Sequence, residues 1–329
     1  MTLSKSEAQK LVWRFINDFR DRVVKKHKTK IDFIIIYGSA SRGEFVPGKS
    51  DVDILIQVYK EKDKEAVKKY ATDTFWNLAK KYPELNFKKS ISNTRKKKSN
   101  LISDSLEKLE ASVFLFQPVF VFHKGEIDWK NGRLNTDNPL LLTGKKWIVP
   151  EQTVFLRFKE EGIILYGRDI RKEIKIELKM VDKLRITIAP QLLSFMGFLI
   201  SPILTKKATN YSIKALLYQV DGILTALDKS RGKNLQNRIK EEKRILIQEY
   251  RKLLYDFLKI KFDFLEDFLN SKDFRIVKQA IKLKWSKESL NYFETINFCF
   301  KAWIFILKVG IRSAVIVFLS RRKKVKRSK

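Results

Sequence analysis

Two short apolar runs beside a Gly-Ser turn and a pair of aspartates constrain this chain more than any other feature. Residues 33–36 (FIII) lead into the turn sequence YGSASRG at 37–43, and residues 54–56 (ILI) follow Asp51 and Asp53. Short β-branched runs bounded by turn residues predict buried strands. Aspartates two positions apart on a strand point to one face, where they repel each other unless a cation lies between them. A turn that opens a helix offers free N–H groups to phosphate, so the stretch predicts metal-assisted chemistry on a nucleotide.

The same stretch resembles the nucleotidyltransferase superfamily of DNA polymerase β type, and within it the minimal nucleotidyltransferases and aminoglycoside adenylyltransferases. Those families carry the pattern G-S-x-x-R-G, a connector, and S-D-x-D-[LI]. The matching residues are Gly38, Ser39, Arg42, Gly43, Ser50, Asp51, Asp53 and Ile54. The specific match covers residues 33–58. A looser one extends to about residue 170, where residues 161–167 (EGIILYG) look like a phrase common near the end of that domain.

The resemblance implies an enzyme that moves a nucleoside monophosphate, with AMP expected, from an NTP to a hydroxyl acceptor. Asp51 and Asp53 would hold one or two Mg²⁺ or Mn²⁺ ions that clamp the triphosphate. The residues expected to bind the nucleotide are Gly38, Ser39, Arg42 and Ser50. Among them, Ser39 and the amides around Gly38 would hold the β- and γ-phosphates, and Arg42 would neutralise the leaving pyrophosphate. The acceptor stays open between RNA, a partner protein and a small molecule.

Members of the superfamily also use a third carboxylate, on the next core strand, as the base that polarises the acceptor hydroxyl. Here that strand is predicted over residues 84–92, and Glu84 is the candidate. Pro83 puts Glu84 at the very edge of the strand, and the central alternate position is Asn86, which is not an acid. The enzyme is therefore expected to be slow or to borrow a base from its helical domain. Alternatively, the chain is a non-catalytic nucleic-acid-binding or membrane-surface protein on a nucleotidyltransferase fold.

A third alternative comes from residues 43–50 (GEFVPGKS), which satisfy the P-loop pattern G-x-x-x-x-G-K-[ST]. A P-loop needs a strand directly before it and a helix directly after it. Here the preceding strand has already ended, and the following residues alternate like a strand. A P-loop NTPase is thus the least favoured function, and residues 47–50 are interpreted as a solvated turn.

The charge of the chain points to a polyanionic partner. The 329 residues include 69 Lys and Arg against 37 Asp and Glu, a net charge of +32. Such a field attracts nucleic acid or acidic surfaces, and RNA, including tRNA, is the expected partner. The basic residues expected to flank the path by which the acceptor reaches the metals are candidates for nucleic-acid binding. They are Lys88, Lys89, Arg95, Lys96, Lys97 and Lys98. The single cysteine, Cys299, excludes an internal disulfide, and a reducing cytoplasm is the expected location.

The predicted fold class is α/β (α+β): a small mixed-sheet nucleotidyltransferase domain at 1–172, an all-α domain at 173–320 and a basic disordered tail at 321–329. The periodicity predicts helices at 5–27, 62–82 and 104–116, with strands at 31–37, 51–58, 84–92 and 119–122. After Pro202 the chain has no proline and three glycines. Helices are predicted at 208–229, 233–268, 272–284 and 287–319. The resemblance implies that this helical domain helps to bind the acceptor, and a helical partner protein is one of the acceptor candidates.

The C-terminal stretch 297–320 is apolar but is interrupted by Lys301, Lys308 and Arg312. It contains no run of about 18 uncharged residues, so no membrane span is expected. The three basic residues are seven and four positions apart, which places them on one helical stripe. The stretch is interpreted as a packed helix with one wet face, with an interfacial membrane helix as the alternative.

Overall fold

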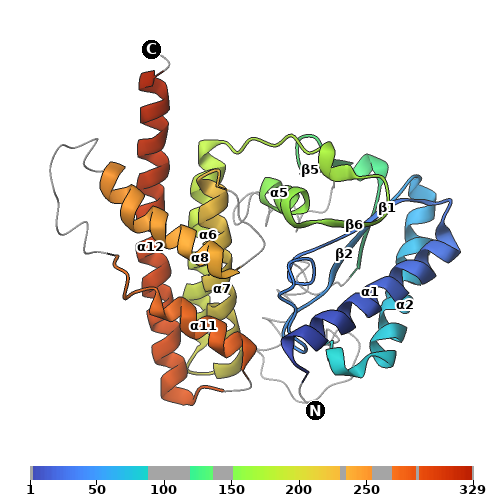
Figure 1. Ribbon diagram of the computed structural model, residues 1–329, viewed down its shortest axis with the longest axis horizontal. Coiled ribbons are helices and arrows are strands. Elements are labelled where there is room, and N and C mark those ends of the chain that lie inside the picture. The colour runs from blue at the N-terminus through green and yellow to red at the C-terminus, as the bar shows by residue number, and fades with distance from the viewer. Residues whose placement is uncertain are drawn as a thin grey trace. The chain divides into compact units, whose positions relative to one another are not determined.

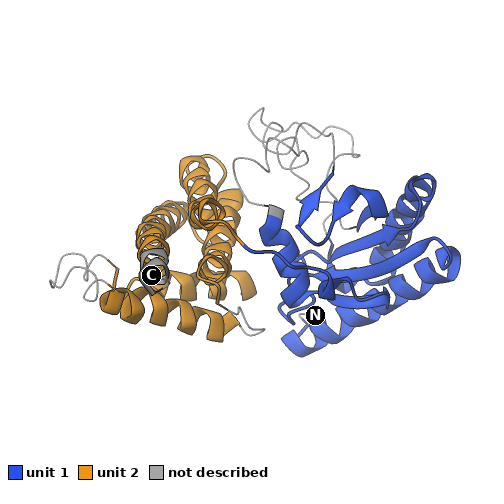
Figure 2. Cartoon of the chain, turned by 90° about the horizontal axis from the view of Figure 1, so that it is seen from above, with its two compact units in different colours: residues 1–147, 151–177 blue, residues 148–150, 178–329 orange. Residues whose placement is uncertain are grey.

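The computed structural model divides the chain into two compact units. Unit 1 comprises Met1–Trp147 and Glu151–Glu177, and unit 2 comprises Ile148–Pro150 and Leu178–Lys329 (Figure 2). The structure describes residues 3–87, 119–135, 151–229, 235–253, 269–286 and 289–327. The predicted helix at 104–116 and the basic candidates Lys88, Lys89 and Arg95 to Lys98 lie outside the described residues.

Unit 1 is a mixed α/β unit (Figure 1). Its elements in chain order are α1 (Lys5–His27), β1 (Ile31–Tyr37), β2 (Asp53–Val58), α2 (Lys64–Lys81), β3 (Val119–His123), β4 (Ile127–Asp128), β5 (Arg133–Leu134), α5 (Glu151–Glu161) and β6 (Ile163–Gly167). Short 3₁₀ turns lie at Glu61–Asp63, Pro83–Leu85, Lys124–Glu126 and Ile170–Lys172. The helix α1 starts at a capping box, in which Ser4 Oγ accepts from the amide of Glu7 and the Glu7 carboxylate accepts from the amide of Ser4.

The central sheet has the strand order β3-β2-β1-β6. Strand β1 pairs antiparallel with both β2 and β6, whereas β2 and β3 run parallel, so the sheet is mixed as predicted. The helices α1 and α2 cover one face, with Ile34 and Ile54 in a shared core. Residues of α5 cover the other face, where Phe158 packs with Leu55. Both faces of β1 and β2 are therefore buried, which explains their continuous apolar runs.

The predicted third strand at 84–92 is wrong for the part that the structure describes. Residues Pro83–Leu85 form a 3₁₀ turn, and Asn86 has a left-handed conformation with a φ of 49°. Neither conformation continues a strand. The alternation of Leu85 and Phe87 that suggested one has another cause: both side chains pack against the core beneath α1 and α2. The strand that lies next to β2 is β3, which the sequence predicted at 119–122.

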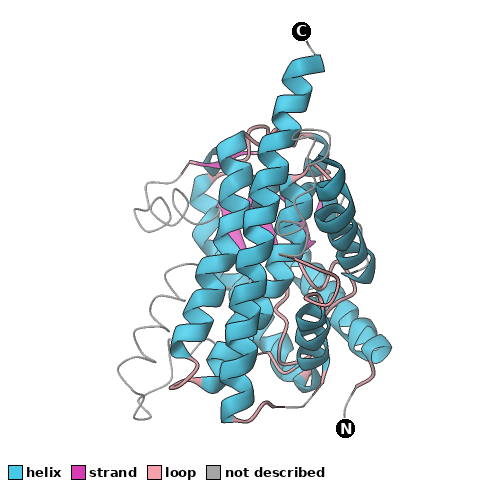
Figure 3. Cartoon of the chain, turned by 90° about the vertical axis from the view of Figure 1, so that its left-hand side faces the viewer, coloured by secondary structure: helices cyan, strands magenta, loops and turns pink. Residues whose placement is uncertain are grey.

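Unit 2 is helical (Figures 1 and 3). Its described elements are α6 (Met180–Ile200), α7 (Thr205–Ala226), α8 (Leu235–Arg244), the π-helical turn Ile245–Glu249, α11 (Arg275–Trp285) and α12 (Tyr292–Arg327). The helix α7 packs against α6, α8, α11 and α12 and supplies much of the buried surface. The helix α6 was not predicted, and its interior contains Pro190. Of the predicted tail at 321–329, residues 321–327 continue α12.

Two helices of unit 2 are long and apolar enough to cross a membrane by length and composition. They are Met180–Ile200, with a mean hydropathy of 1.3, and Tyr292–Ser320, with a mean hydropathy of 2.0. A buried core helix passes the same test, and 56% of the most apolar window of the second helix is buried inside the structure. The expectation of no membrane span considered only residues 297–320, but residues 186–205 also form an uncharged run.

Candidate functional site

The predicted aspartates lie at one edge of the sheet, where β1 ends and β2 begins. The ladder between these antiparallel strands closes with Tyr37 opposite Asp53, so residues 38–52 form the connection at that edge. Between the two aspartates, Val52 is fully buried in the core, whereas Asp51 is exposed and Asp53 is half-buried. This alternation fits two carboxylates on the same side of the backbone, as the spacing predicts.

The backbone of Gly38 lies close to the carboxylate of Asp53. The φ of Gly38 is +78°, which L residues with a side chain rarely adopt. A Cβ atom at position 38 would lie 2.7 Å from Oδ2 of Asp53. A glycine is therefore required here both by the backbone conformation and by the carboxylate against it. In addition, the hydroxyl of Ser39 donates to the carbonyl of Asp51 at 3.3 Å, which links the turn to the aspartate segment.

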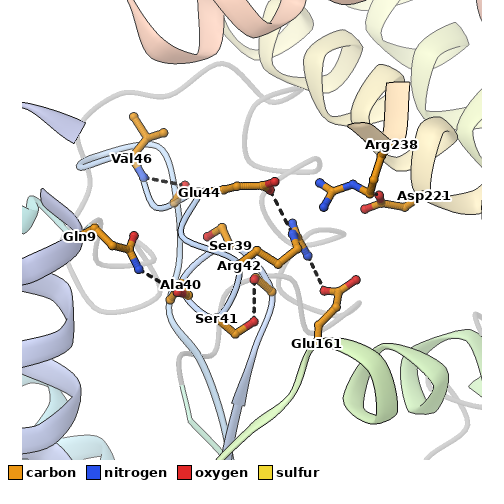
Figure 4. A network of polar contacts seen from close by, with 12 residues as sticks. Gln9, Ser39, Ala40, Ser41, Arg42, Glu44, Val46, Glu161, Asp221 and Arg238 are labelled. Carbon is orange, nitrogen blue, oxygen red and sulfur yellow. Dashed lines mark hydrogen bonds and ion pairs between the residues drawn. The ribbon is translucent and has the colours of Figure 1, made fainter. Parts of the chain in front are cut away.

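The Gly-Ser turn is wound like a short helix start. The amide of Arg42 donates to the carbonyl of Gly38 at 3.3 Å, and the amide of Glu44 donates to the carbonyl of Ser39 at 2.8 Å. From α1, Gln9 Nε2 donates to the carbonyl of Ala40 at 3.0 Å, which fixes the turn to that helix (Figure 4). The first amides of such a turn precede its internal hydrogen bonds and point out of it, which is the geometry that binds phosphate.

The guanidinium of Arg42 lies between two carboxylates (Figure 4). Its Nε lies 3.0 Å from Oε2 of Glu44, and its Nη1 pairs with Oε2 of Glu161 at the end of α5. All three side chains are largely buried, at 12%, 9% and 5% exposure for Arg42, Glu44 and Glu161. The predicted phosphate ligand Arg42 is thus turned towards two carboxylates, and it ties the Gly-Ser turn to the helix on one face of the sheet.

The segment that resembled a P-loop does not have P-loop geometry. No helix follows Ser50, because β2 begins at Asp53. The hydroxyl of Ser50 accepts from the amide of Val46 at 3.0 Å, and the amide of Ser50 donates to the carbonyl of Val46. Residues 46–50 therefore form the turn that the sequence suggested. The predicted nucleotide-binding residue Ser50 closes this turn and is itself buried.

The structure does not place Glu84 on a strand with the aspartates. Glu84 is exposed on the 3₁₀ turn Pro83–Leu85, whose last carbonyl accepts from the amide of Gly48 at 3.1 Å. The strand beside β2 is β3, with Val119 opposite Ile54. Its sequence, VFVFH, contains no acid. Within the described residues, the sheet therefore supplies two carboxylates at this edge and no third one.

Two carboxylates fit a hard divalent cation that also binds substrate phosphate. In the described part of the chain, no group of three or more His, Cys, Asp or Glu side chains could hold a metal by itself. Mg²⁺ typically binds to one or two carboxylates, with substrate phosphates and water completing its octahedral shell. The close packing of Asp53 against Gly38 places such a carboxylate next to the turn that would hold the phosphates. The donor set thus suits a metal–nucleotide complex better than a permanent metal site.

Three side chains around the turn were not predicted from the sequence: Gln9, Glu44 and Glu161. Residues 161–167 resemble the end of the domain, but that resemblance assigns no role to Glu161. In the structure Glu161 reaches Arg42 across 119 positions of sequence. Glycines explain the rest of the phrase: Cβ atoms at Gly162 and Gly167 would overlap the backbone of Phe158 and Asp32, respectively.

The chain was compared with protein families, curated proteins and solved structures. The family model described as "Nucleotidyltransferase domain" matches residues 16–109. Among solved structures, the spectinomycin adenyltransferase AAD(9) from Enterococcus faecialis with ATP and spectinomycin is similar at 12% identity and a TM-score of 0.44, covering 90% of this chain and 98% of that chain. No curated protein matches the chain. Residues 16–109 are thus similar to a nucleotidyltransferase domain, and this similarity covers less than half of the chain.

Proposed function

We propose that unit 1 catalyses metal-dependent transfer of a nucleoside monophosphate, with AMP expected, from an NTP to a hydroxyl acceptor. The observation that carries the proposal is the approach of Asp53 to Gly38. It puts a carboxylate directly beside the turn whose amides suit a triphosphate.

In this proposal each group has a defined task. Asp51 and Asp53 hold Mg²⁺ or Mn²⁺, which supplies Lewis acidity and neutralises charge on the phosphates. The amides after Gly38 bind the β- and γ-phosphates. Arg42 keeps the turn in shape through its ion pairs with Glu44 and Glu161. Positioning and charge stabilisation supply most of the rate enhancement of such reactions.

The acceptor hydroxyl attacks the α-phosphorus, its proton leaves to a base or to water, and pyrophosphate departs. Among the described residues of the sheet, no third carboxylate lies at the strand where a base is expected. We therefore expect slow turnover unless the acceptor or another part of the chain provides the base. The strongly basic chain favours RNA as the acceptor class over a cationic small molecule.

The test uses α-³²P-labelled ATP, CTP, GTP and UTP with Mg²⁺, total RNA and a soluble extract. The intact chain is compared with Asp51→Asn, Asp53→Asn and a surface control, Asp21→Asn on α1. We expect label in one acceptor class with the intact chain and the control, and a loss of about a thousandfold with either active-site variant. Equal labelling by Asp53→Asn and the intact chain would reject the proposal.

A non-catalytic role in nucleic-acid binding is the second candidate, and the acid-free strand β3 favours it. It predicts that RNA binds equally well to the intact chain and to Asp53→Asn, with strong salt dependence and no label transfer with any NTP. Label transfer that depends on Asp53 would exclude it.

A further inference from the structure

We propose that unit 2 binds peripherally to an anionic phospholipid surface through an exposed apolar face shared by α6 and α12. The exposed residues that define this α6–α12 face are Ile188, Leu192, Leu199, Phe293, Phe300 and Ile311. Leu192 and Leu199 are 50% and 51% exposed, and Phe293 is 80% exposed. The inference does not depend on nucleotidyl transfer.

The two helices present these residues on the same side. Gln191 Nε2 donates to the carbonyl of Ile306, and Phe198 packs on Phe300 with ring centroids 5.5 Å apart. As residue numbers rise along α6 they fall along α12, so the helices are antiparallel neighbours. On α6 the exposed residues follow a 3–4 residue spacing, and on α12 Phe293, Phe300 and Ile311 fall within a narrow arc of the helix. The aromatic contacts around Trp303 join the two stripes into one surface.

The opposite sides of both helices pack on protein, so the α6–α12 face is the outer side of this helix pair. On α6, a Cβ at Gly197 would lie 2.8 Å from Ser212 Oγ of α7, which shows close helix packing. On α12, the buried guanidinium of Arg312 donates to the carbonyls of Leu246 and Leu269 at 3.1 and 2.7 Å. Helices with one protein-packed side and one apolar outer side suit the interfacial plane of a membrane.

The charge around the face selects an anionic occupant. Residues 186–205 contain no charged side chain, and Arg185 and Lys206 flank that run. After Glu294, every charged residue of α12 is basic, and its C-terminal end projects beyond the other helices of unit 2 (Figures 1 and 3). Residues 178–329 contain 33 Lys and Arg against 13 Asp and Glu. Such an excess disfavours a second copy of the chain on this face and favours anionic lipid headgroups.

The test is flotation of the full chain with vesicles of phosphatidylcholine alone or mixed with phosphatidylglycerol. The face variant is Leu192→Glu/Ile311→Glu, and Tyr59→Glu/Val154→Glu in unit 1 is the matched control. Both variants replace two exposed apolar residues and add the same charge. We expect the intact chain and the control to float with the mixed vesicles only. The face variant should bind about tenfold more weakly, with an unchanged melting temperature.

A second readout places the face against the lipid. Brominated acyl chains should quench tryptophan fluorescence of the intact chain, and Trp303→Phe should remove more of this quenching than Trp76→Phe of α2. Equal loss of binding in both double variants would reduce the effect to charge and overturn the proposal. The proposal would also be overturned if the intact chain did not float with the vesicles. The same holds if the face variant dissociated a dimer seen by light scattering, or if it lost RNA binding in place of vesicle binding.

Discussion

Both units bury charged side chains, but they do so in different ways. In unit 1 one guanidinium, that of Arg42, meets the two carboxylates of Glu44 and Glu161. In unit 2 Arg238 Nε lies 2.9 Å from Oδ1 of Asp221, and the neighbouring carboxyl of Glu242 accepts from the side-chain amide of Gln219, with no cation paired to it among the described residues. The first arrangement lies in a connection at the sheet edge, and the second lies between helices.

The difference teaches what each cluster can do. A cation between two carboxylates holds a loop in one conformation, because each pairing fixes a different nitrogen of the guanidinium. A fully buried carboxyl without a cation avoids the cost of a buried charge by staying protonated. Burial raises the pKa of Glu242 to about 8. The charges in unit 1 thus shape a site, whereas Glu242 of unit 2 is a neutral acid near pH 7.

The largest expected effect is on the stability of unit 2. Asp221→Asn should lower the free energy of unfolding by about 4 kcal/mol, because it leaves the buried Arg238 without this counter-charge. Urea unfolding followed by circular dichroism measures the change. The double variant Asp221→Leu/Arg238→Met is the control and should recover most of the loss, since it removes both charges together. A loss that persists in the double variant would contradict the buried-pair explanation.

Glu242→Gln should stabilise the chain at alkaline pH. The pKa of Glu242 in the folded state, about 8, lies above the ordinary value of 4.5. Its contribution to stability is therefore fully present below pH 4.5 and is lost as the pH rises through 8. The glutamine cannot ionise, so the variant should gain on the order of 5 kcal/mol over the parent between acidic and alkaline pH. Glu241→Gln is the control, since Glu241 is adjacent but only half-buried and pairs with Arg244. Parallel pH profiles of the parent and Glu242→Gln would refute the assignment.

The sequence predicted the elements whose patterns are strictly local. The helices and strands of residues 5–82 followed from 3.6-residue and β-branched patterns, and the observed bounds of α1, β1 and β2 lie close to the predicted ones. The strand at 84–92 failed because alternation of Leu85 and Phe87 also arises when a 3₁₀ turn packs on a core. The helix α6 was missed because a proline argues against a helix interior, yet Pro190 is buried within it.

The candidate site was predictable only in part, for a physical reason. Gly38 and Asp53 lie close together because they flank one connection between antiparallel strands, a proximity that the sequence analysis did not predict. The partners of Arg42 were not predictable. Glu161 is remote in sequence and reaches Arg42 only because α5 packs on the sheet, and no local pattern encodes that meeting. The roles of Ser39, Arg42 and Ser50 in nucleotide binding stay predictions.

Gly38→Ala tests whether the site in unit 1 depends on close approach as well as on charge. The new Cβ would lie 2.7 Å from Asp53 Oδ2 and displace that carboxylate. We expect nucleotidyl transfer to fall about thirtyfold, or about 2 kcal/mol in activation free energy. Gly43→Ala is a matched control, because its φ of +73° is equally unusual but no atom lies within 4 Å of the added Cβ. Similar losses of activity in both variants would show that backbone strain alone is responsible.

The smallest effect should come from the ion pair that links the turn to α5. Glu161→Gln keeps the size of the side chain but removes one of the two carboxylates that pair with Arg42 in Figure 4, while the pair with Glu44 remains. The turn then has one fixed point fewer, and transfer should fall about tenfold in kcat, with little change in melting temperature. Glu160→Gln, the adjacent and exposed position, is the control. If Glu161→Gln instead unfolded unit 1 while Glu44→Gln did not, the pair would be a support for the fold like Asp221–Arg238, and the contrast between the two units would disappear.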